Sequence, residues 1–181
     1  MITGNKGEWS EFYTFVKLLA DGKIYAADEE LNKKENLFYT ILKILRGIDL
    51  EFLRSDKIFI QSSNGELYSE LSIAEITEIS NSVLSKINNA EAGARAFSVP
   101  EIENQFSMLH TTTLSDERKE TADIRIVIHD PVTQFEPLLG FSIKSYLGGK
   151  PTLFNASKNS NVIFRITPEL TEPDGNYIKQ H

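Results

Sequence analysis

The stretch ADIRIVIHD, residues 122–130, alternates strictly between two kinds of side chain. One face holds Ile124, Ile126 and Ile128, and the other holds Asp123, Arg125, Val127 and His129. A strand that is buried on one side repeats with period two, so this stretch predicts a β-strand. Asp130-Pro131 ends the pattern, and a second apolar run, LLGFSIKS, follows shortly afterwards. The two runs predict an antiparallel hairpin, and the rest of the fold must accommodate it.

The second run of this hairpin carries a lysine on an otherwise apolar strand. In GFSIKSYLGG, residues 140–149, Ser142 and Lys144 share one face, while Phe141 and Ile143 share the other. A lysine that points to the same side as a serine either serves a polar site or faces water. If the isoleucine faces pack on helices, Asp123 lies with Ser142 and Lys144 on one exposed surface.

Hydrophobic spacing and cap signals predict the other elements. EWSEFYTFVKLLADG, residues 8–22, has apolar side chains at three- and four-residue spacing and ends in Gly22, which predicts a capped helix. KIYAAD and LFYTILKIL favour strands, although the second run is also compatible with a helix. The remaining elements are a hairpin at Asn64-Gly65, a helix from the capping box of Ser72 and Glu75 to Asn88-Asn89, a helix from Ser98, with Pro100 and Glu101, to about Met108, and a strand at 161–166.

The composition fits a globular domain and argues against several classes of protein. The 181 residues are 40% apolar, which suffices for a packed core, and no run approaches the roughly 18 apolar residues of a membrane span. The absence of cysteine excludes disulfides and thiolate metal sites. With no apolar secretory segment at the N-terminus, a bacterial cytoplasmic setting is expected. The net charge of −7 argues against a general polyanion binder, although residues 144–165 hold four basic and no acidic side chains.

The order of the polar hairpin residues resembles the PD-(D/E)xK pattern of nucleases. In that pattern an aspartate is followed, on an adjoining strand, by an acid, one intervening residue and a lysine. Here Asp123 precedes Ser142-Ile143-Lys144 by 19 residues. The carboxylates of such a site hold Mg²⁺, a hard ion that prefers oxygen ligands, and the lysine lies near the attacking water. A solvated amphipathic hairpin would show the same residues, and it is the alternative interpretation.

Two longer phrases carry a more specific resemblance. GNKGEWSEFYTFVKLLADGKIYAAD near the N-terminus and LGFSIKSYLGGKPTLFNASKNSNVIFRI near the C-terminus, with ETADIRIVIHD between them, resemble the HpaII-type restriction endonucleases. The resemblance implies a bacterial type II restriction enzyme that cuts double-stranded DNA at CCGG with Mg²⁺ as cofactor. It also implies a companion DNA methyltransferase that acts on the same site. Because that site is palindromic, a homodimer is the expected assembly.

The resemblance assigns roles to residues of the hairpin. Asp123 would bind the metal, Ser142 would occupy the second acidic position, and Lys144 would be the catalytic lysine. The Ile143 carbonyl would complete the metal site. Serine cannot supply a carboxylate, so another residue must furnish the charge, or the site uses fewer metal ligands. Some other CCGG-cutting nucleases also have Ser-x-Lys and carry the glutamate on a following helix, but this chain has no glutamate between Lys144 and Glu169.

The first helix offers the preferred substitute for the missing acid. In many nucleases of this fold that helix lies beside the catalytic strands and contributes a glutamate. Glu8 is therefore the first candidate, and Glu11, on nearly the same face, is the weaker one. The competing role for Glu8 is that of a first-turn glutamate favoured by the helix dipole. If Glu8 points away from Asp123, Glu136 and Glu169 are the remaining candidates.

Polar residues near both ends of the chain are candidates for DNA contacts. They are Asn5 and Lys6, before the first helix, and Lys150, Asn155 and Lys158, in the loop after the hairpin. The lysines suit phosphates, and the asparagines supply hydrogen-bonding groups. The start of a helix and a polar surface loop would have the same composition. His110 and His129 each stand alone and are assigned no role.

The expected fold is α/β. It combines a restriction-endonuclease-like core, with a mixed sheet, an antiparallel catalytic hairpin and the first helix, and an inserted α/β or helical lobe. Residues 1–181 are interpreted as a single nuclease core with the inserted segment at about 23–118. Members of the family are longer, so a C-terminal DNA-reading region is expected beyond His181. Two rival interpretations stay open: a catalytically inactive nuclease-like domain that binds DNA, and a protein-interaction domain built on the acidic insertion.

Overall fold

The computed structural model describes residues 2–89, 96–116 and 122–145. The chain divides into two units, Met1–Pro151 and Thr152–His181, and the described residues belong to the first. The elements in chain order are β1 (Thr3–Gly4), α1 (Lys6–Asp21), β2 (Lys23–Ala27), β3 (Lys33–Arg46), β4 (Leu50–Arg54), β5 (Lys57–Ser62), β6 (Leu67–Ser72), α2 (Ile73–Asn89), β7 (Phe97–Ser98), the 3-10 turn η1 (Pro100–Ile102), α3 (Glu103–Met108), β8 (Ile124–His129) and β9 (Leu138–Phe141).

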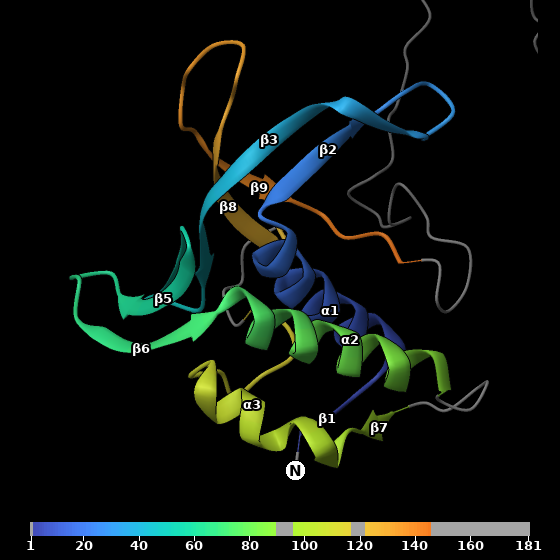
Figure 1. Ribbon diagram of the computed structural model, residues 1–181. Helices are drawn as coiled ribbons and strands as arrows, with labels where there is room; N and C mark the ends of the chain where they lie inside the picture. The colour runs from blue at the N-terminus through green and yellow to red at the C-terminus, as the bar shows by residue number, and fades with distance from the viewer. Residues whose placement is uncertain (1, 90–95, 117–121, 146–181) are drawn as a thin grey trace, which may run out of the picture. The chain divides into compact units, whose positions relative to one another are not determined.

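Seven strands form one sheet, and every pairing between the described strands of this sheet is antiparallel (Figure 1). The order across the sheet is β6-β5-β4-β3-β8-β9, and β2 pairs with the first part of β3. β3 is 14 residues long, which allows its end to lie between β4 and β8 while its beginning pairs with β2. The parallel pair that a mixed sheet requires is not found among the described strands. β1 and β7 form a separate two-stranded ladder.

The first helix is fixed at both ends by its own sequence. The Asn5 side chain accepts the Glu8 N–H at 3.0 Å, and the Glu8 carboxylate accepts the Asn5 N–H at 2.8 Å. This reciprocal capping box satisfies N–H groups that have no partner within the helix. Gly22 ends the helix in the left-handed conformation, with φ at 65°, and Arg54 donates to the Leu19 carbonyl at 2.8 Å. A cation at this end complements the helix dipole.

The core lies between α1 and one face of the sheet. The α1 residues predicted to be apolar contacts, Trp9, Phe12, Val16 and Leu19, are fully buried. Phe15 packs edge-on against Phe52 of β4, with ring centroids 4.8 Å apart. The three isoleucines of β8 are also buried, and α2 lies alongside α1 (Figure 1). The alternation of the sequence therefore decides which face of the sheet is covered.

Most of the predicted elements are confirmed. LFYTILKIL is a strand and not a helix. The hairpin at Asn64-Gly65 joins β5 to β6, and the capping box of Ser72 and Glu75 begins α2. The predicted strand at 161–166 lies outside the described residues.

The prediction that Ser98 caps a helix is wrong. Ser98 pairs with Thr3 in the β1–β7 ladder, and the chain then enters the turn η1 at Pro100 without a side-chain cap. The Trp9 indole N–H donates to the Phe97 carbonyl at 3.0 Å, and this long-range bond helps to hold the segment extended. Tertiary contacts thus override a local cap signal.

The segment 23–118 combines strands with helices, as expected for the predicted insertion. Its strands β2–β6 belong to the same sheet as β8, because β3 pairs directly with β8 through Ile44 and Ile126. Its helix α2 packs on α1. The segment therefore builds the layers that hold the hairpin, and its origin as an insertion stays a prediction. Within the part of the chain that the structure describes, no helix is long and apolar enough to cross a membrane.

Candidate active site

The start of β8 and the segment after β9 meet through the side chain of Asp123. β8 and β9 pair antiparallel, with Ile124 opposite Phe141. Asp123 lies immediately before β8 and donates its N–H to the Phe141 carbonyl at 3.0 Å. Its Oδ2 accepts the Ile143 N–H at 2.6 Å. The structure therefore brings Asp123 together with the Ser142–Lys144 segment, as the alternating patterns predict.

The same hydrogen bond explains why β9 is shorter than predicted. The pattern of GFSIKS predicts a strand through Lys144, but β9 ends at Phe141. The Ile143 N–H is donated to a carboxylate and not to a backbone carbonyl of β8, so the ladder stops there. Ile143 still packs against the core, while Ser142 and Lys144 are exposed. The two faces inferred from the sequence persist beyond the end of the strand.

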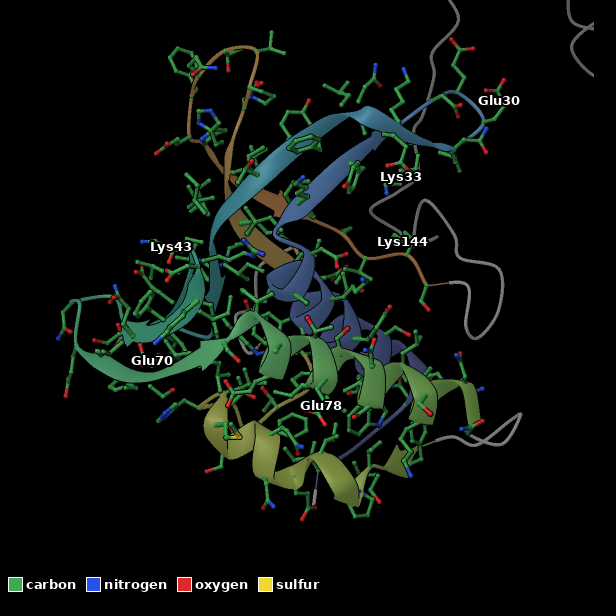
Figure 2. All side chains as sticks on the ribbon, viewed as in Figure 1. Glu30, Lys33, Lys43, Glu70, Glu78 and Lys144 are labelled. Atoms are coloured by element: carbon green, nitrogen blue, oxygen red, sulfur yellow. The ribbon has the colours of Figure 1, made fainter. Side chains whose placement is uncertain are left out.

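The segment that follows β9 runs beside α1. The Ser145 hydroxyl donates to the Ser10 hydroxyl at 3.0 Å, and Ser10 is buried within α1. Figure 2 shows Lys144 on this segment, just after β9. Among the described residues, no carboxylate forms an ion pair with the Lys144 ammonium. Contacts on both sides of Lys144 thus hold its backbone between Asp123 and α1, and its side chain is exposed.

Two glutamates of α1 differ in what their carboxylates contact. Glu8 is used in the capping box, where it accepts the Asn5 N–H at 2.8 Å. Glu11, one turn further along, is half-buried. Burial raises the pKa of Glu11 above its ordinary value, a hydrogen bond with Ser115 opposes this rise, and the negative charges of Asp123 and Glu8 add to it. The charge of Asp123 therefore contributes to the raised pKa of Glu11, while the Glu8 carboxylate is engaged at the helix end.

A buried arginine fixes the backbone next to Glu11. Arg46, at the end of β3, is 7% exposed and donates from Nη2 to the carbonyls of Thr113 and Leu114, each at 2.7 Å. A third bond, of 3.2 Å, reaches the Ser115 carbonyl, and the positive charge of Arg46 lowers the pKa of Glu11. Arg46 thereby holds the Ser115 backbone that faces α1. The role of Arg46 leaves no local pattern in the sequence, because these contacts join residues 67 to 69 positions apart.

The oxygen donors at this site suit a small divalent cation. Asp123 and Glu11 place two carboxylates close enough for their negative charges to repel. Mg²⁺ is commonly bound by one or two carboxylates, and waters and substrate phosphates complete its coordination. Among the described residues, no group of three or more His, Cys, Asp or Glu side chains is arranged to hold a metal ion. The donor set fits an ion with few protein ligands, and metal-binding roles for Asp123, Glu8 and Ile143 stay predictions.

Other candidates lie apart from this cluster or outside the described residues. The Glu136 carboxylate is 3.6 Å from Nδ1 of His129, at the opposite end of the hairpin from Asp123. The Asn5 side chain is engaged as a helix cap, and Lys6 is the first residue of α1. The candidate residues that lie outside the described ranges are Lys150, Asn155, Lys158 and Glu169.

Known proteins resemble this chain over nearly its whole length. The family model for the HpaII restriction endonuclease matches residues 5–180. The type II restriction enzyme HpaII of Haemophilus parainfluenzae is 42% identical over 169 residues, which cover 91% of this chain and 46% of that enzyme. The chain therefore spans less than half the length of the curated relative that it matches. No solved structure matches it.

Proposed function

Because this chain belongs to the HpaII restriction endonuclease family, we propose that it carries the cleavage site of a type II restriction endonuclease. The reaction would be the Mg²⁺-dependent hydrolysis of double-stranded DNA at CCGG, with release of a 5′-phosphate. The observation that carries this proposal is the 2.6 Å hydrogen bond from Ile143 N–H to the Asp123 carboxylate. It joins the aspartate to the Ser142–Lys144 segment, which supports a cleavage site of the nuclease type at this point.

Each residue of the site has a separate task in this proposal. The carboxylates of Asp123 and Glu11, with the Ile143 carbonyl, would hold Mg²⁺. The ion would polarise the scissile phosphate and lower the pKa of the attacking water. The Lys144 ammonium would orient that water and stabilise the charge that develops on the phosphate. The hydrogen bond between Ser145 and Ser10 would help to position Lys144. A displacement of about 1 Å would slow a reaction that depends on the alignment of its groups.

Glu11 would supply the negative charge that Ser142 cannot. The Glu8 carboxylate already accepts the Asn5 N–H, whereas Glu11 is half-buried beside the charge of Asp123. Burial and a nearby like charge disfavour the ionised form of a carboxylate. A cation bound beside it favours that ionised form. In the proposed site Glu11 therefore takes the place of Glu8, the first candidate from the sequence.

An inactive nuclease-like domain that binds DNA is the second candidate, and Ser142 is the observation that favours it. Without an acid at this position, the site has fewer carboxylates than the general nuclease pattern. Titration with Mg²⁺ separates the two candidates. An inactive domain would bind duplex DNA to the same extent with and without Mg²⁺ and would leave it uncut, whereas the proposed enzyme would cut only with the metal.

Plasmid cleavage tests the proposal directly. A supercoiled plasmid with CCGG sites is incubated with the chain in Mg²⁺ or in a chelator, and the product ends are sequenced. We expect cuts within CCGG that require Mg²⁺ and that are lost in Asp123→Asn. Cleavage that persists in the chelator, or that is undiminished in Asp123→Asn, would contradict the assignment.

Assembly and cellular context form part of the same proposal. A palindromic site is matched by a protein with two-fold symmetry, so the enzyme would act as a homodimer. A DNA methyltransferase would protect the same sites of the host in the bacterial cytoplasm. Light scattering of the chain with and without a CCGG duplex measures its molar mass. A monomeric mass in both samples would contradict the proposed homodimer.

A further inference from the structure

β2 and the beginning of β3 form a two-stranded ribbon that extends past the rest of the sheet (Figure 1). One face of this ribbon stacks cations on aromatic rings. Lys23 Nζ lies 4.1 Å from the centroid of the Phe38 ring, and Lys33 Nζ lies 3.7 Å from that of Tyr25. The two rings are 5.8 Å apart. These four residues are called the cation–aromatic ladder below.

The strand register places the ladder on the same face of the sheet as Asp123. Lys23 is opposite Thr40 of β3, and Thr40 is opposite His129 of β8. Residues that are paired across two strands point to the same face of the sheet. Because alternate residues of a strand share a face, the face of His129 is also the face of Asp123. The other face holds Ile124, Ile126 and Ile128, which are buried in the core. The ladder and the proposed cleavage site therefore lie on the same side of the sheet, and Arg125, which lies between His129 and Asp123 on that side of β8, is itself buried.

We propose that the cation–aromatic ladder is a contact surface for the phosphodiester backbone of duplex DNA. This inference rests on the function proposed above and assigns a surface to the substrate of the same site. Lysine ammonium groups neutralise phosphates, and a ring beneath an ammonium holds it in place through a cation–π interaction. A two-stranded ribbon is also narrow enough to enter the major groove of DNA. The lysines are exposed while the rings are half-buried, so the surface presents charge more than apolar area.

The two lysines of the ladder differ in their existing partners. Lys33 forms an ion pair of 3.0 Å with Glu35, whose side chain is 75% exposed. Within the described ranges, no carboxylate forms an ion pair with Lys23. Lys23 would therefore contact a phosphate directly, whereas Lys33 would exchange Glu35 for a phosphate. Glu35 thus competes with DNA for Lys33. Removal of the Glu35 charge should therefore strengthen DNA binding, whereas removal of a ladder lysine should weaken it.

Binding of a short labelled duplex, measured by fluorescence anisotropy over a series of salt concentrations, tests the ladder. Ca²⁺ replaces Mg²⁺ so that the duplex stays uncut. Lys23→Gln should weaken binding equally for duplexes with and without CCGG, and it should reduce the slope of log Kobs against log salt by about 0.9. Glu35→Gln should tighten binding, because it removes the competing carboxylate.

Lys57→Gln is the matched control. Lys57 has an ion pair of 3.1 Å with Glu70, and its side chain is 46% exposed against 49% for Lys33. Figure 2 shows Glu70, on β6, on the opposite side of the view from Lys33, on the β2–β3 ribbon. This variant removes the same charge from a comparable pair outside the ribbon, so it should leave the salt slope unchanged. Circular dichroism of each variant confirms that the fold is kept.

Each outcome decides for or against the ladder. An unchanged slope in Lys23→Gln, an equal loss in Lys57→Gln, or no binding by the unaltered chain at low salt would overturn it. Plasmid cleavage in Mg²⁺ separates this result from the fate of the cleavage site. Mg²⁺-dependent cutting together with an unchanged slope would reject the ladder alone. A reduced slope in a chain that does not cut would support the ladder and reject the cleavage proposal.

Discussion

The two faces of the seven-stranded sheet differ although their residues alternate along the same strands. The face toward α1 is apolar, and Ile44 and Ile126 are fully buried where β3 and β8 pair. The opposite face is polar, with Lys43 paired to Glu51 at 2.9 Å, and it leads along β8 to Asp123. Along β8, residues that hold the fold together are thus separated from the polar residues that lead to Asp123 by the thickness of one strand. Substitutions on either face should therefore have separable effects.

The largest effect is expected from Lys144→Ala, and only on cleavage. Removing a group that moves a proton or stabilises charge in the transition state costs on the order of 10² to 10⁴ in rate. Because Lys144 is exposed, the free energy of unfolding should change by less than about 0.5 kcal/mol. Plasmid cleavage and urea unfolding of the same preparation check both parts. Undiminished cutting would remove Lys144 from the mechanism.

A large loss of stability is expected from Ile126→Ala, on the apolar face. Ile126 is fully buried, and truncation of such a side chain lowers the free energy of unfolding by about 2–5 kcal/mol. The adjacent residue on the polar face, Val127, is only half-buried, so Val127→Ala is the matched control and should cost less. Urea unfolding measures both. Equal losses would show that the two faces contribute alike to stability.

A smaller effect is expected from Asn5→Ala, which removes the cap of α1. Loss of an N-cap side chain lowers the free energy of unfolding by about 1 kcal/mol. The structure gives Asn5 this role through its bond to the Glu8 N–H at 3.0 Å. If Asn5 instead contacts DNA, as its position in the sequence allows, Asn5→Ala should weaken duplex binding without this loss. Unfolding and anisotropy measurements on one variant distinguish the two roles.

The smallest effect on the free energy of unfolding is expected from Glu11→Gln, and it depends on pH. Burial and the charges of Asp123 and Glu8 raise the pKa of Glu11, so the folded chain binds this proton more tightly than the unfolded chain. The resulting stability is present below the ordinary pKa and is lost as pH rises through the folded-state value. The Glu11→Gln side chain cannot ionise. The variant should therefore be more stable than the unaltered chain at neutral pH, and this advantage should disappear in acid. Urea unfolding at both pH values measures this difference, and an equal change at each would contradict the argument.

Local patterns predicted those parts of the fold that depend on neighbouring residues. The alternation around Ile126 identified β8, and the spacing of α1 identified its buried residues, because each pattern reports one face of one element. The order of the strands and the double use of β3 depend on contacts between distant segments. For the same reason Ser98 was assigned to a helix cap although its backbone pairs with Thr3.

The position of Asp123 beside the Ser142–Lys144 segment was predictable from the hairpin, whereas the contribution of α1 was less so. Asp123 and Lys144 follow from the two alternating runs. Glu8 and Glu11 share nearly one face of the helix, so spacing alone could not rank them. The sequence did contain one signal, because Asn5 followed three residues later by Glu8 is a capping-box pattern that assigns Glu8 to the helix end. The burial of Glu11 beside Asp123 required the tertiary structure.

The central claim is that Asp123 and Glu11 together hold the metal in a site where Ser142 supplies no acid. Its most direct test is the rate of CCGG plasmid cleavage as Mg²⁺ is titrated into the unaltered chain, Glu11→Gln and Glu8→Gln. We predict that Glu11→Gln needs a far higher Mg²⁺ concentration or fails to cut, while Glu8→Gln follows the unaltered chain. An unchanged Mg²⁺ dependence in Glu11→Gln, with cleavage lost in Glu8→Gln, would contradict the claim.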